Sequence, residues 1–175
     1  MRARLGPWLV AAAVAAAAIF ALENGSRTPP PLTRGSVAPD FSLPRLDGSG
    51  EASLSGLRGH VVLVSFWATW CKPCEGEMPA LQRLHAELAG SDFELLAVSV
   101  DANEPEVRAF RDRLGLSFPI LLDPARKVST LYQTFRYPET LLIGRDGVVV
   151  ERYVGPRAWD DPLYLARIRD LLGRS

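Results

Sequence analysis

The chain has 175 residues, 47% of them hydrophobic, which suits one folded domain with short appendages. Basic and acidic residues both number 20, so the formal net charge is zero and no basic block stands ready to bind nucleic acid. The two cysteines are too few for a disulfide framework, so a redox or metal-binding role has to be judged from the residues around them.

The N-terminal segment predicts export from the cytoplasm. Arg2 and Arg4 precede a charge-free apolar stretch from Gly6 to Leu22, the arrangement of a secretory signal or a signal anchor. We expect residues 1–22 to anchor the protein in a bacterial inner membrane, with the rest of the chain in the periplasm or otherwise outside the cytoplasm. A cleaved signal peptide is the alternative, because Ala-x-Ala triplets occur within the stretch.

A spacer and a hairpin are predicted next. Residues 23–34 are polar and contain three consecutive prolines, Pro29 to Pro31, which favour an extended linker. The folded domain is expected to occupy residues 35–175 and to open with a β-hairpin. The two strands of this hairpin and its turn are predicted at Phe41–Leu43, Glu51–Leu54 and Asp47-Gly48.

Strand and helix patterns alternate through the middle of the chain. Val61 to Trp67 is a continuous apolar run with the length and β-branched content of a buried strand. An amphipathic helix should follow from about Lys72 to Leu88. A second core strand, a helix with a capping-box-like start and a short strand are then predicted at Phe93–Val100, Asn103–Leu114 and Phe118–Leu122.

The C-terminal third predicts one more helix, a second hairpin and a last helix. These are expected at Arg126–Phe135, at Thr140–Ile143 paired with Val148–Tyr153, and after a cap at Asp160 or Asp161. The buried stripe of the last helix is expected to consist of Leu165, Ile168 and Leu172. Alternating strands and helices followed by a hairpin and a helix imply an α/β domain with a mixed central sheet flanked by helices.

The two cysteines lie between the apolar strand and the amphipathic helix, in the sequence Cys71-Lys72-Pro73-Cys74. At the first turn of a helix, unpaired N–H groups and the helix dipole favour a thiolate over a thiol. Cys71 is therefore the expected nucleophile, at an exposed position. Cys74 shares a helical stripe with Met78, so it should face the protein interior.

This spacing predicts thiol-disulfide exchange, in which Cys71 attacks a disulfide and Cys74 resolves the mixed disulfide. Lys72 and Pro73 are expected to tune the redox potential of the pair, and Trp70 to lie at the active-site surface. A structural disulfide and a metal-binding pair are the alternatives for the two cysteines.

Other polar residues near the pair are interpreted as structural. Glu75 and Glu77 read as solvated helix charges, and Asp101 as a residue that closes a strand. His85 lies eleven residues along the helix from the second cysteine, about 16 Å away, and His60 precedes the core strand at its far end. Neither histidine is expected to share a metal with the cysteines, and no metal site is predicted.

Four motifs occur in order between residues 35 and 172. They are Gly35-Ser36-Val37-Ala38-Pro39-Asp40-Phe41, the run from Leu57 to Cys71, Glu77-Met78-Pro79, and Tyr137-Pro138-Glu139-Thr140. Together they resemble the thioredoxin superfamily, and within it the membrane-anchored extracytoplasmic branch of TlpA, ResA and DsbE (CcmG) proteins.

The resemblance implies a thioredoxin fold with an N-terminal β-hairpin extension and a β-α insertion at about Val98–Leu122. It also implies that Pro138 is a cis-proline opposite the cysteine pair, and that Tyr137 offers its backbone to an extended client. Trp70 and Pro138 are further residues expected to bind the client. Thioredoxins carry a buried Asp, and many TlpA-like proteins an Asn, where this chain has Ser65. A carboxylate base for the second cysteine is therefore not expected at that position.

The same resemblance implies a reductase of client protein disulfides, with no cofactor beyond the redox-active cysteine pair. The client would be apocytochrome c in cytochrome c maturation, and electrons would come from a membrane thiol transporter of the DsbD/CcdA type. A reductant or thiol-based chaperone for copper-site assembly is the alternative. A peroxidase is disfavoured because the chain has no Thr-x-x-Cys arrangement, and a redox-inert binding module because a second thiol is present.

Overall fold

The computed structural model describes residues 7–24 and 32–173, and the chain divides into two units between residues 31 and 32. Helix α1 (Pro7–Asn24) lies in the first unit. Among the described residues, no helix has both the length and the apolarity needed to cross a membrane. Two features of the N-terminal prediction lie outside the described residues. They are the arginines that precede the apolar stretch, Arg2 and Arg4, and the proline run of the spacer.

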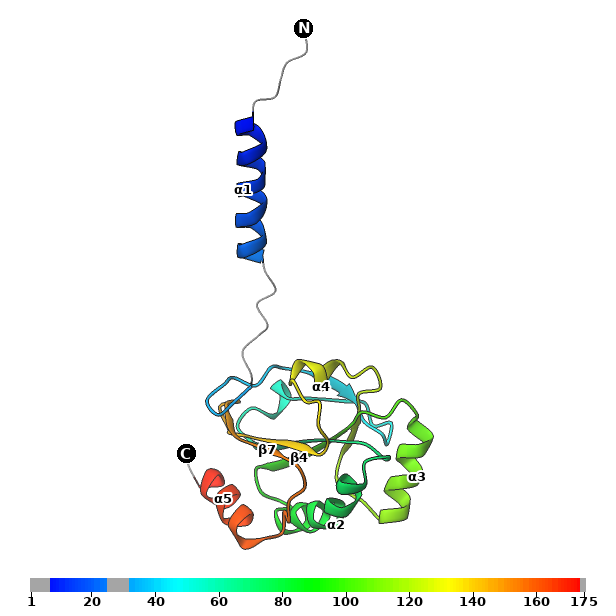
Figure 1. The fold of residues 1–175 in the computed structure, drawn as a ribbon. Coiled ribbons are helices and arrows are strands. Elements are labelled where there is room, and N and C mark those ends of the chain that lie inside the picture. Colours follow the sequence, from blue (N-terminus) through cyan, green and yellow to red (C-terminus); the bar gives the residue numbers. More distant parts are fainter. Residues whose placement is uncertain (1–6, 25–31, 174–175) are drawn as a thin grey trace. The chain divides into compact units, whose positions relative to one another are not determined.

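A five-stranded mixed sheet forms the centre of the second unit (Figure 1). Three strands, β3 (Val61–Trp67), β4 (Phe93–Ser99) and β5 (Ile120–Leu122), run parallel to one another. β6 (Glu139–Ile143) is antiparallel to both of its neighbours. β3 is buried along its whole length, as its continuous apolar run predicts. In spatial order the strands are β5, β4, β3, β6 and β7 (Val149–Val154).

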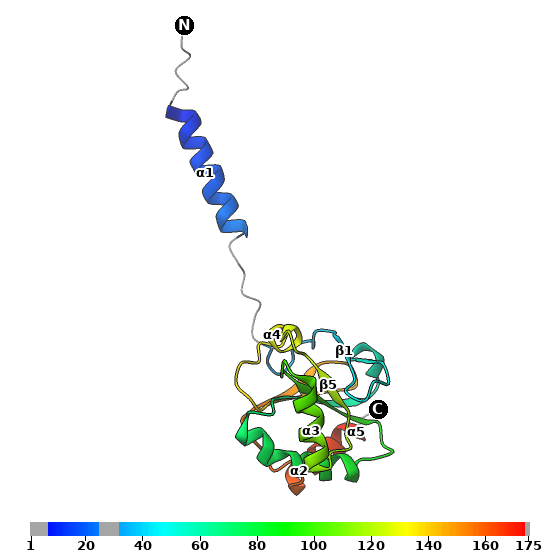
Figure 2. The same cartoon turned by 90° about the vertical axis from the view of Figure 1, so that its right-hand side faces the viewer.

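Helices cover both faces of this sheet (Figures 1 and 2). Leu63 and Trp67 of β3 belong to the core on one face, while Val64 and Phe66, which point the other way, belong to the core on the opposite face. The predicted α/β domain with a mixed sheet is therefore confirmed. The first core contains residues of α2 (Lys72–Glu87), α3 (Glu104–Leu114) and α5 (Pro162–Leu172), and the second contains residues of α4 (Lys127–Leu131).

The N-terminal hairpin is present as predicted. β1 (Ser42–Pro44) and β2 (Glu51–Ser53) pair antiparallel, and a short 3-10 helix, η1 (Ser55–Leu57), leads from them toward β3. Leu43 and Ala52 of the hairpin pack into the same core as α4. The hairpin therefore covers part of the sheet face that carries α4.

Helix α4 is shorter than the sequence predicts. A helix was expected over Arg126–Phe135, but α4 spans only Lys127–Leu131. Gln133 adopts a left-handed backbone conformation with a φ of 53°. The N–H of Gln133 and that of the next residue bond back to the carbonyls of Thr130 and Ser129. This pair of hydrogen bonds defines the Schellman motif, which ends many helices and usually has glycine at the left-handed position. Because Gln133 occupies that position here, the sequence contains no glycine to mark the helix end.

The last helix follows the prediction closely. The Asp161 side chain caps α5 by accepting a hydrogen bond from the backbone N–H of Leu163 at 2.9 Å. Ile168 is buried, and Leu165 and Leu172 pack half-buried against the same core. The predicted stripe therefore attaches α5 to the face of the sheet that also carries α2.

Candidate active site

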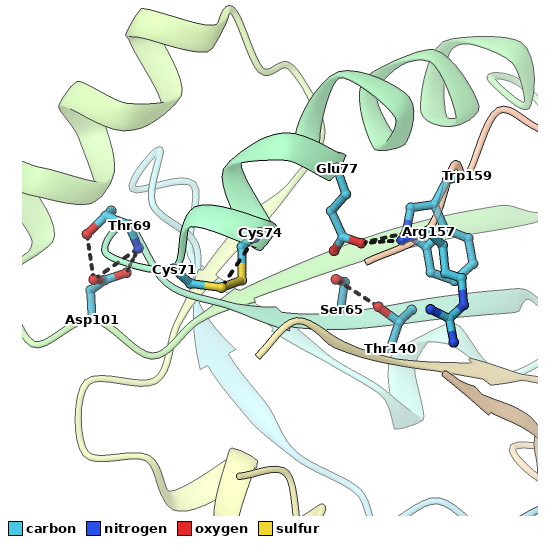
Figure 3. Close-up of a disulfide and its surroundings, with 9 residues drawn as sticks. All are labelled: Ser65, Thr69, Cys71, Cys74, Glu77, Asp101, Thr140, Arg157 and Trp159. Atoms are coloured by element: carbon cyan, nitrogen blue, oxygen red, sulfur yellow. Dashed lines mark hydrogen bonds between the residues drawn. A yellow bond between two sulfur atoms is a disulfide. The ribbon is translucent and has the colours of Figure 1, made fainter. Parts of the chain in front are cut away.

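The cysteine pair lies at the N-terminus of α2, directly after the loop that leaves β3 (Figure 3). Cys71 is the N-cap residue, with extended backbone angles, and its Sγ accepts a hydrogen bond from the N–H of Cys74 at 3.3 Å. Pro73 sits in the first turn, where its missing N–H removes no helical hydrogen bond. The two sulfurs form a disulfide, and the Cα atoms lie 5.2 Å apart. The positive end of α2 therefore acts on Cys71, as the sequence predicts.

The two cysteines differ in accessibility, although less than expected. Cys74 has an exposed fraction of 0%, in agreement with its predicted inward position, whereas Cys71 is 6% exposed. The expectation of an exposed Cys71 is wrong for the disulfide state, because its sulfur is bonded to Cys74 and its side chain packs in the core that contains Trp67. Cys71 is nevertheless the more accessible of the two cysteines.

Asp101 fixes the loop that leads into the cysteines. Its buried carboxylate accepts hydrogen bonds from the backbone N–H of Thr69 at 2.9 Å and from the Thr69 hydroxyl at 2.7 Å. Figure 3 shows the bonds from Thr69, and the carboxylate also accepts one from the Ser99 hydroxyl at 2.8 Å. Asp101 therefore does more than end a strand, since it ties the start of the cysteine loop to the end of β4.

Tyr137 and Pro138 stand beside the same end of β3. The bond between them is cis, as the family resemblance implies. In the antiparallel register of β3 and β6, Phe66 pairs with Glu139, so Pro138 is one step further toward the cysteine loop. The Trp70 side chain, 60% exposed, meets the Tyr137 ring edge-to-face at a centroid distance of 6.0 Å. Trp70, the residue before Cys71, and Tyr137 thus meet beside the cysteine loop, and both are residues expected to bind the client.

Glu77 is the site residue that the sequence interpretation missed. It is buried, and its Oε2 accepts hydrogen bonds from the Arg157 backbone N–H at 3.1 Å and from Trp159 Nε1 at 3.3 Å (Figure 3). Its Oε1 is buried without a hydrogen-bond partner among the described residues. Burial raises the pKa of Glu77 to about 7, although both hydrogen bonds and the Arg157 charge act to lower it.

The interpretation of Glu77 as a solvated charge is therefore wrong. The sequence did carry a signal, because Glu77 comes three residues after Cys74 and one before Met78, on the buried face of an amphipathic helix. In Figure 3 its carboxylate extends from α2 toward the strands that carry Ser65 and Thr140. Those two side chains are themselves buried and joined by a hydrogen bond from the Thr140 hydroxyl to Ser65 Oγ at 3.0 Å.

Glu75, by contrast, lies in a network of opposite charges. Lys72 Nζ contacts one of its carboxylate oxygens at 3.0 Å, and the Arg113 guanidinium contacts the other at 2.6 Å. The hydrogen bonds from Arg113 and then Lys72 lower the pKa of Glu75 below its ordinary value. Because the Lys72 side chain is 88% exposed and shares its charge with Glu75, its effect on the cysteine pair is screened.

A buried ion pair supports the segment that carries Tyr137 and Pro138. Arg152 of β7 contacts the Glu139 carboxylate at 2.7 Å, and both side chains are largely buried. The same guanidinium donates hydrogen bonds to the backbone carbonyls of Leu32, Tyr132 and Gln133. Arg152 thus ties the start of β6 to the loop that follows α4.

Neither histidine is near the cysteines in the fold. His60 directly precedes β3, whereas the cysteines follow the other end of this seven-residue strand, about 20 Å away. The His85 ring packs edge-to-face on Phe118 at 6.3 Å. In residues 7–24 and 32–173, no group of three or more His, Cys, Asp or Glu side chains is placed to hold a metal ion.

Sequence comparisons agree with this geometry. The model of the AhpC/TSA family matches residues 34–152. The thioredoxin-like protein YneN of Bacillus subtilis is 42% identical over 127 residues, which are 71% of this chain and 73% of that protein. The thiol-disulfide oxidoreductase ResA of Geobacillus kaustophilus is 41% identical over 127 residues, 73% of this chain and 72% of that protein.

Solved structures show the same fold. A Chlorobium tepidum crystal structure, provisionally assigned as the thiol:disulfide interchange protein DsbE, has a TM-score of 0.74 at 33% identity and covers 81% of this chain and 99% of that one. The thioredoxin domain of a thiol-disulfide oxidoreductase from Bacteroides vulgatus has a TM-score of 0.70 at 26% identity, with coverages of 80% and 99%. The expected thioredoxin fold, with its N-terminal hairpin, is confirmed.

Proposed function

We propose that this chain, which belongs to the AhpC/TSA family and is a thiol-disulfide oxidoreductase with a Cys71–Cys74 pair, works as a reductase of client protein disulfides outside the cytoplasm. The client class we propose is apocytochrome c during cytochrome c maturation. Electrons would reach the oxidised pair from a membrane thiol transporter of the DsbD/CcdA type. The similarity to ResA and DsbE proteins supports the chemistry, and the asymmetry of the two cysteines supports the order of its steps.

The proposed exchange has two balanced steps. The Cys71 thiolate attacks one sulfur of a client disulfide, which forms a mixed disulfide and releases the other client sulfur as a thiolate. The Cys74 thiolate then attacks Cys71 Sγ, forms the intramolecular disulfide and releases the second client thiolate. The client gains two electrons and the cysteine pair loses them. The observation that carries this order is the complete burial of Cys74 beside a more accessible Cys71 at the helix N-terminus.

Glu77 is the group we propose to hold the proton of Cys74. A resolving thiol must lose its proton before it attacks, and Ser65 stands where a carboxylate would serve in thioredoxins. Glu77 lies one helical turn after Cys74 with a pKa raised to about 7, so it exchanges a proton near neutral pH. Replacement of Glu77 by Gln should slow release of the mixed disulfide and change the pH dependence of that step. An unchanged pH profile would remove Glu77 from the reaction.

Trapping of mixed disulfides tests the division of labour between the cysteines. The Cys74→Ala variant should accumulate disulfide-linked complexes with client proteins, because attack proceeds and release does not. Complexes are resolved by non-reducing electrophoresis after acid quenching and alkylation. The matched control is the double variant Cys71→Ser/Cys74→Ala, which should trap nothing. Equal trapping by the double variant would contradict the proposed roles.

The location of the protein is the remaining part of the proposal. The apolar stretch from Gly6 to Leu22, preceded by two arginines, supports an N-terminal inner-membrane anchor that leaves the thioredoxin-like domain in the periplasm. The full-length protein should then stay in the membrane fraction after a high-salt wash. A soluble periplasmic protein with a mature N-terminus near residues 18–28 would show that the stretch is a cleaved signal.

A further inference from the structure

A small pocket adjoins the cysteine loop on the side of α4. Its volume is about 260 Å³, and it is lined on one side by Trp70, the residue before Cys71, and by Tyr137, the residue before Pro138. Arg126 and Phe135 line it from the ends of the α4 region. Because small-molecule sites usually have about 300 to 1,000 Å³, this space suits a single side chain of a docked peptide better than a separate ligand.

The pocket wall contains side chains that contacts within the protein do not fully satisfy. Phe135 is 71% exposed and Trp70 is 60% exposed, so two large aromatic side chains of the pocket wall face solvent. Thr134, which also lines it, is 1% exposed, and its buried Oγ1 has no hydrogen-bond partner among the described residues. A buried hydroxyl without a partner is costly to the folded protein, so the pocket wall carries an unused polar group.

The chain segment that supplies most of the pocket lining carries charge of one sign. Between Asp123 and Glu139 the chain carries Arg126, Lys127 and Arg136, all exposed, and no acidic residue. None of these three cations forms an ion pair within the part of the chain that the structure describes.

The two acids that bracket this segment are buried and already engaged. Asp123 accepts hydrogen bonds from the N–H groups of Lys127 and Ser129 at 2.8 Å each, and Glu139 pairs with Arg152 at 2.7 Å. They are therefore not free to pair with the exposed cations. The positive charge of the segment faces solvent beside the cysteine loop.

We infer that this α4 surface, formed by Trp70, Arg126, Lys127, Phe135, Arg136 and Tyr137, selects clients whose cysteine is followed or preceded by a bulky apolar side chain and by acidic residues. The apolar side chain fills the pocket, and the carboxylates meet the unpaired cations. The inference rests on the proposed exchange at Cys71 and adds the chemical class of its substrate. Three solvated cations act mainly on the encounter rate, so the preference weakens as salt rises.

The test uses the full-length reduced protein in a neutral detergent and three synthetic peptides. Each peptide carries Phe next to one Cys that is linked by a disulfide to 2-mercaptoethanol, and the flanking positions hold three Glu, three Gln or three Lys. Reduction is followed by rapid acid quench and chromatography. Every rate constant is divided by the rate of the same variant with hydroxyethyl disulfide, a small neutral substrate, to remove changes in the reactivity of Cys71.

The acidic peptide should react about tenfold faster than the basic one at low salt, with the ratio falling toward one at 0.5 M salt. The variant Arg126→Asn/Arg136→Gln should lose most of the ratio; Asn is chosen because Arg126 has a φ of 53°, which Asn tolerates. The control Arg167→Gln/Arg169→Gln removes the same charge from α5 and should keep the ratio. Replacement of the peptide Phe by Ser should slow all three peptides severalfold.

Each failure has a distinct meaning. A protein that does not reduce hydroxyethyl disulfide refutes the proposed exchange itself. A protein that reduces it but treats acidic and basic peptides alike overturns only the inferred selectivity. Equal loss of the ratio in the α5 control would show that net charge, and not the α4 surface, sets the preference. A concentration-dependent dimer that the Arg126→Asn/Arg136→Gln variant abolishes would assign the surface to a second copy of the chain and also overturn the inference.

Discussion

Glu77→Gln should make the stability of the protein less sensitive to pH. Burial raises the pKa of Glu77 from 4.5 to about 7, so the folded protein holds a proton that the unfolded chain releases between these values. The stability linked to this proton is fully present below pH 4.5 and is lost as pH rises through about 7. At about 1.4 kcal/mol per pKa unit, the loss amounts to about 3 kcal/mol. Glutamine has nearly the same shape as protonated glutamate and stays neutral at every pH. The free energy of unfolding of the variant therefore does not fall over this pH range.

The assay is urea unfolding of the oxidised protein at a series of pH values from 4 to 8. The free energy of unfolding of the variant, minus that of the wild type, should rise by about 3 kcal/mol across this range. Glu75→Gln is the matched control in the same helix. Its pKa is lowered from 4.5 by Arg113 and Lys72, so its stabilising contribution is fully present above that pH and is lost only as pH falls below it. The difference for Glu75→Gln should therefore stay nearly constant from about pH 5 to 8. A constant difference for Glu77→Gln would refute the assignment of a buried, proton-holding carboxylate.

Two further stability predictions come from the buried contacts around the site. Asp101→Ala removes the acceptor that holds the cysteine loop and should lower the free energy of unfolding by about 2 to 4 kcal/mol. The control is Asp112→Ala at an exposed position, which should change the free energy of unfolding by no more than about 0.5 kcal/mol in the same urea titration. Arg152→Met strands the buried Glu139 carboxylate and should cost about 3 to 5 kcal/mol. The double variant Arg152→Met/Glu139→Leu should recover part of that loss; a strictly additive double variant would argue against a coupled pair.

Much of the fold was predictable because local patterns and tertiary structure agree. The run from Val61 to Trp67 is apolar on both faces, which suits only a strand in the centre of a sheet, and β3 has those bounds. Helix α2 begins at the predicted Lys72, since the cysteine before it serves as N-cap and Pro73 suits a first turn. The cis bond before Pro138 was expected from the family resemblance alone, because a lone X-Pro bond is cis in only about 5 to 6% of cases.

The failures have physical reasons. The end of α4 depends on a left-handed Gln133, which ordinary helix-stop signals do not reveal. The burial of Glu77 depends on the Arg157 backbone and on Trp159, which lie 80 and 82 residues away in the sequence and compensate part of its desolvation. Likewise, the partners of Arg152 are set by the register of β6 and β7 and by the loop after α4, none of which is local in sequence.

The reduction potential of the Cys71–Cys74 pair tests most directly the claim that the protein is a reductase. The full-length protein is equilibrated in dithiothreitol and glutathione redox buffers, and the oxidised fraction is measured by alkylation of free thiols. A reductase should have a potential of about −250 mV or lower, the range of proteins that donate electrons to disulfides. A value of about −120 mV, typical of a strong dithiol oxidant, would reverse the direction of electron flow and contradict the assignment as a reductase.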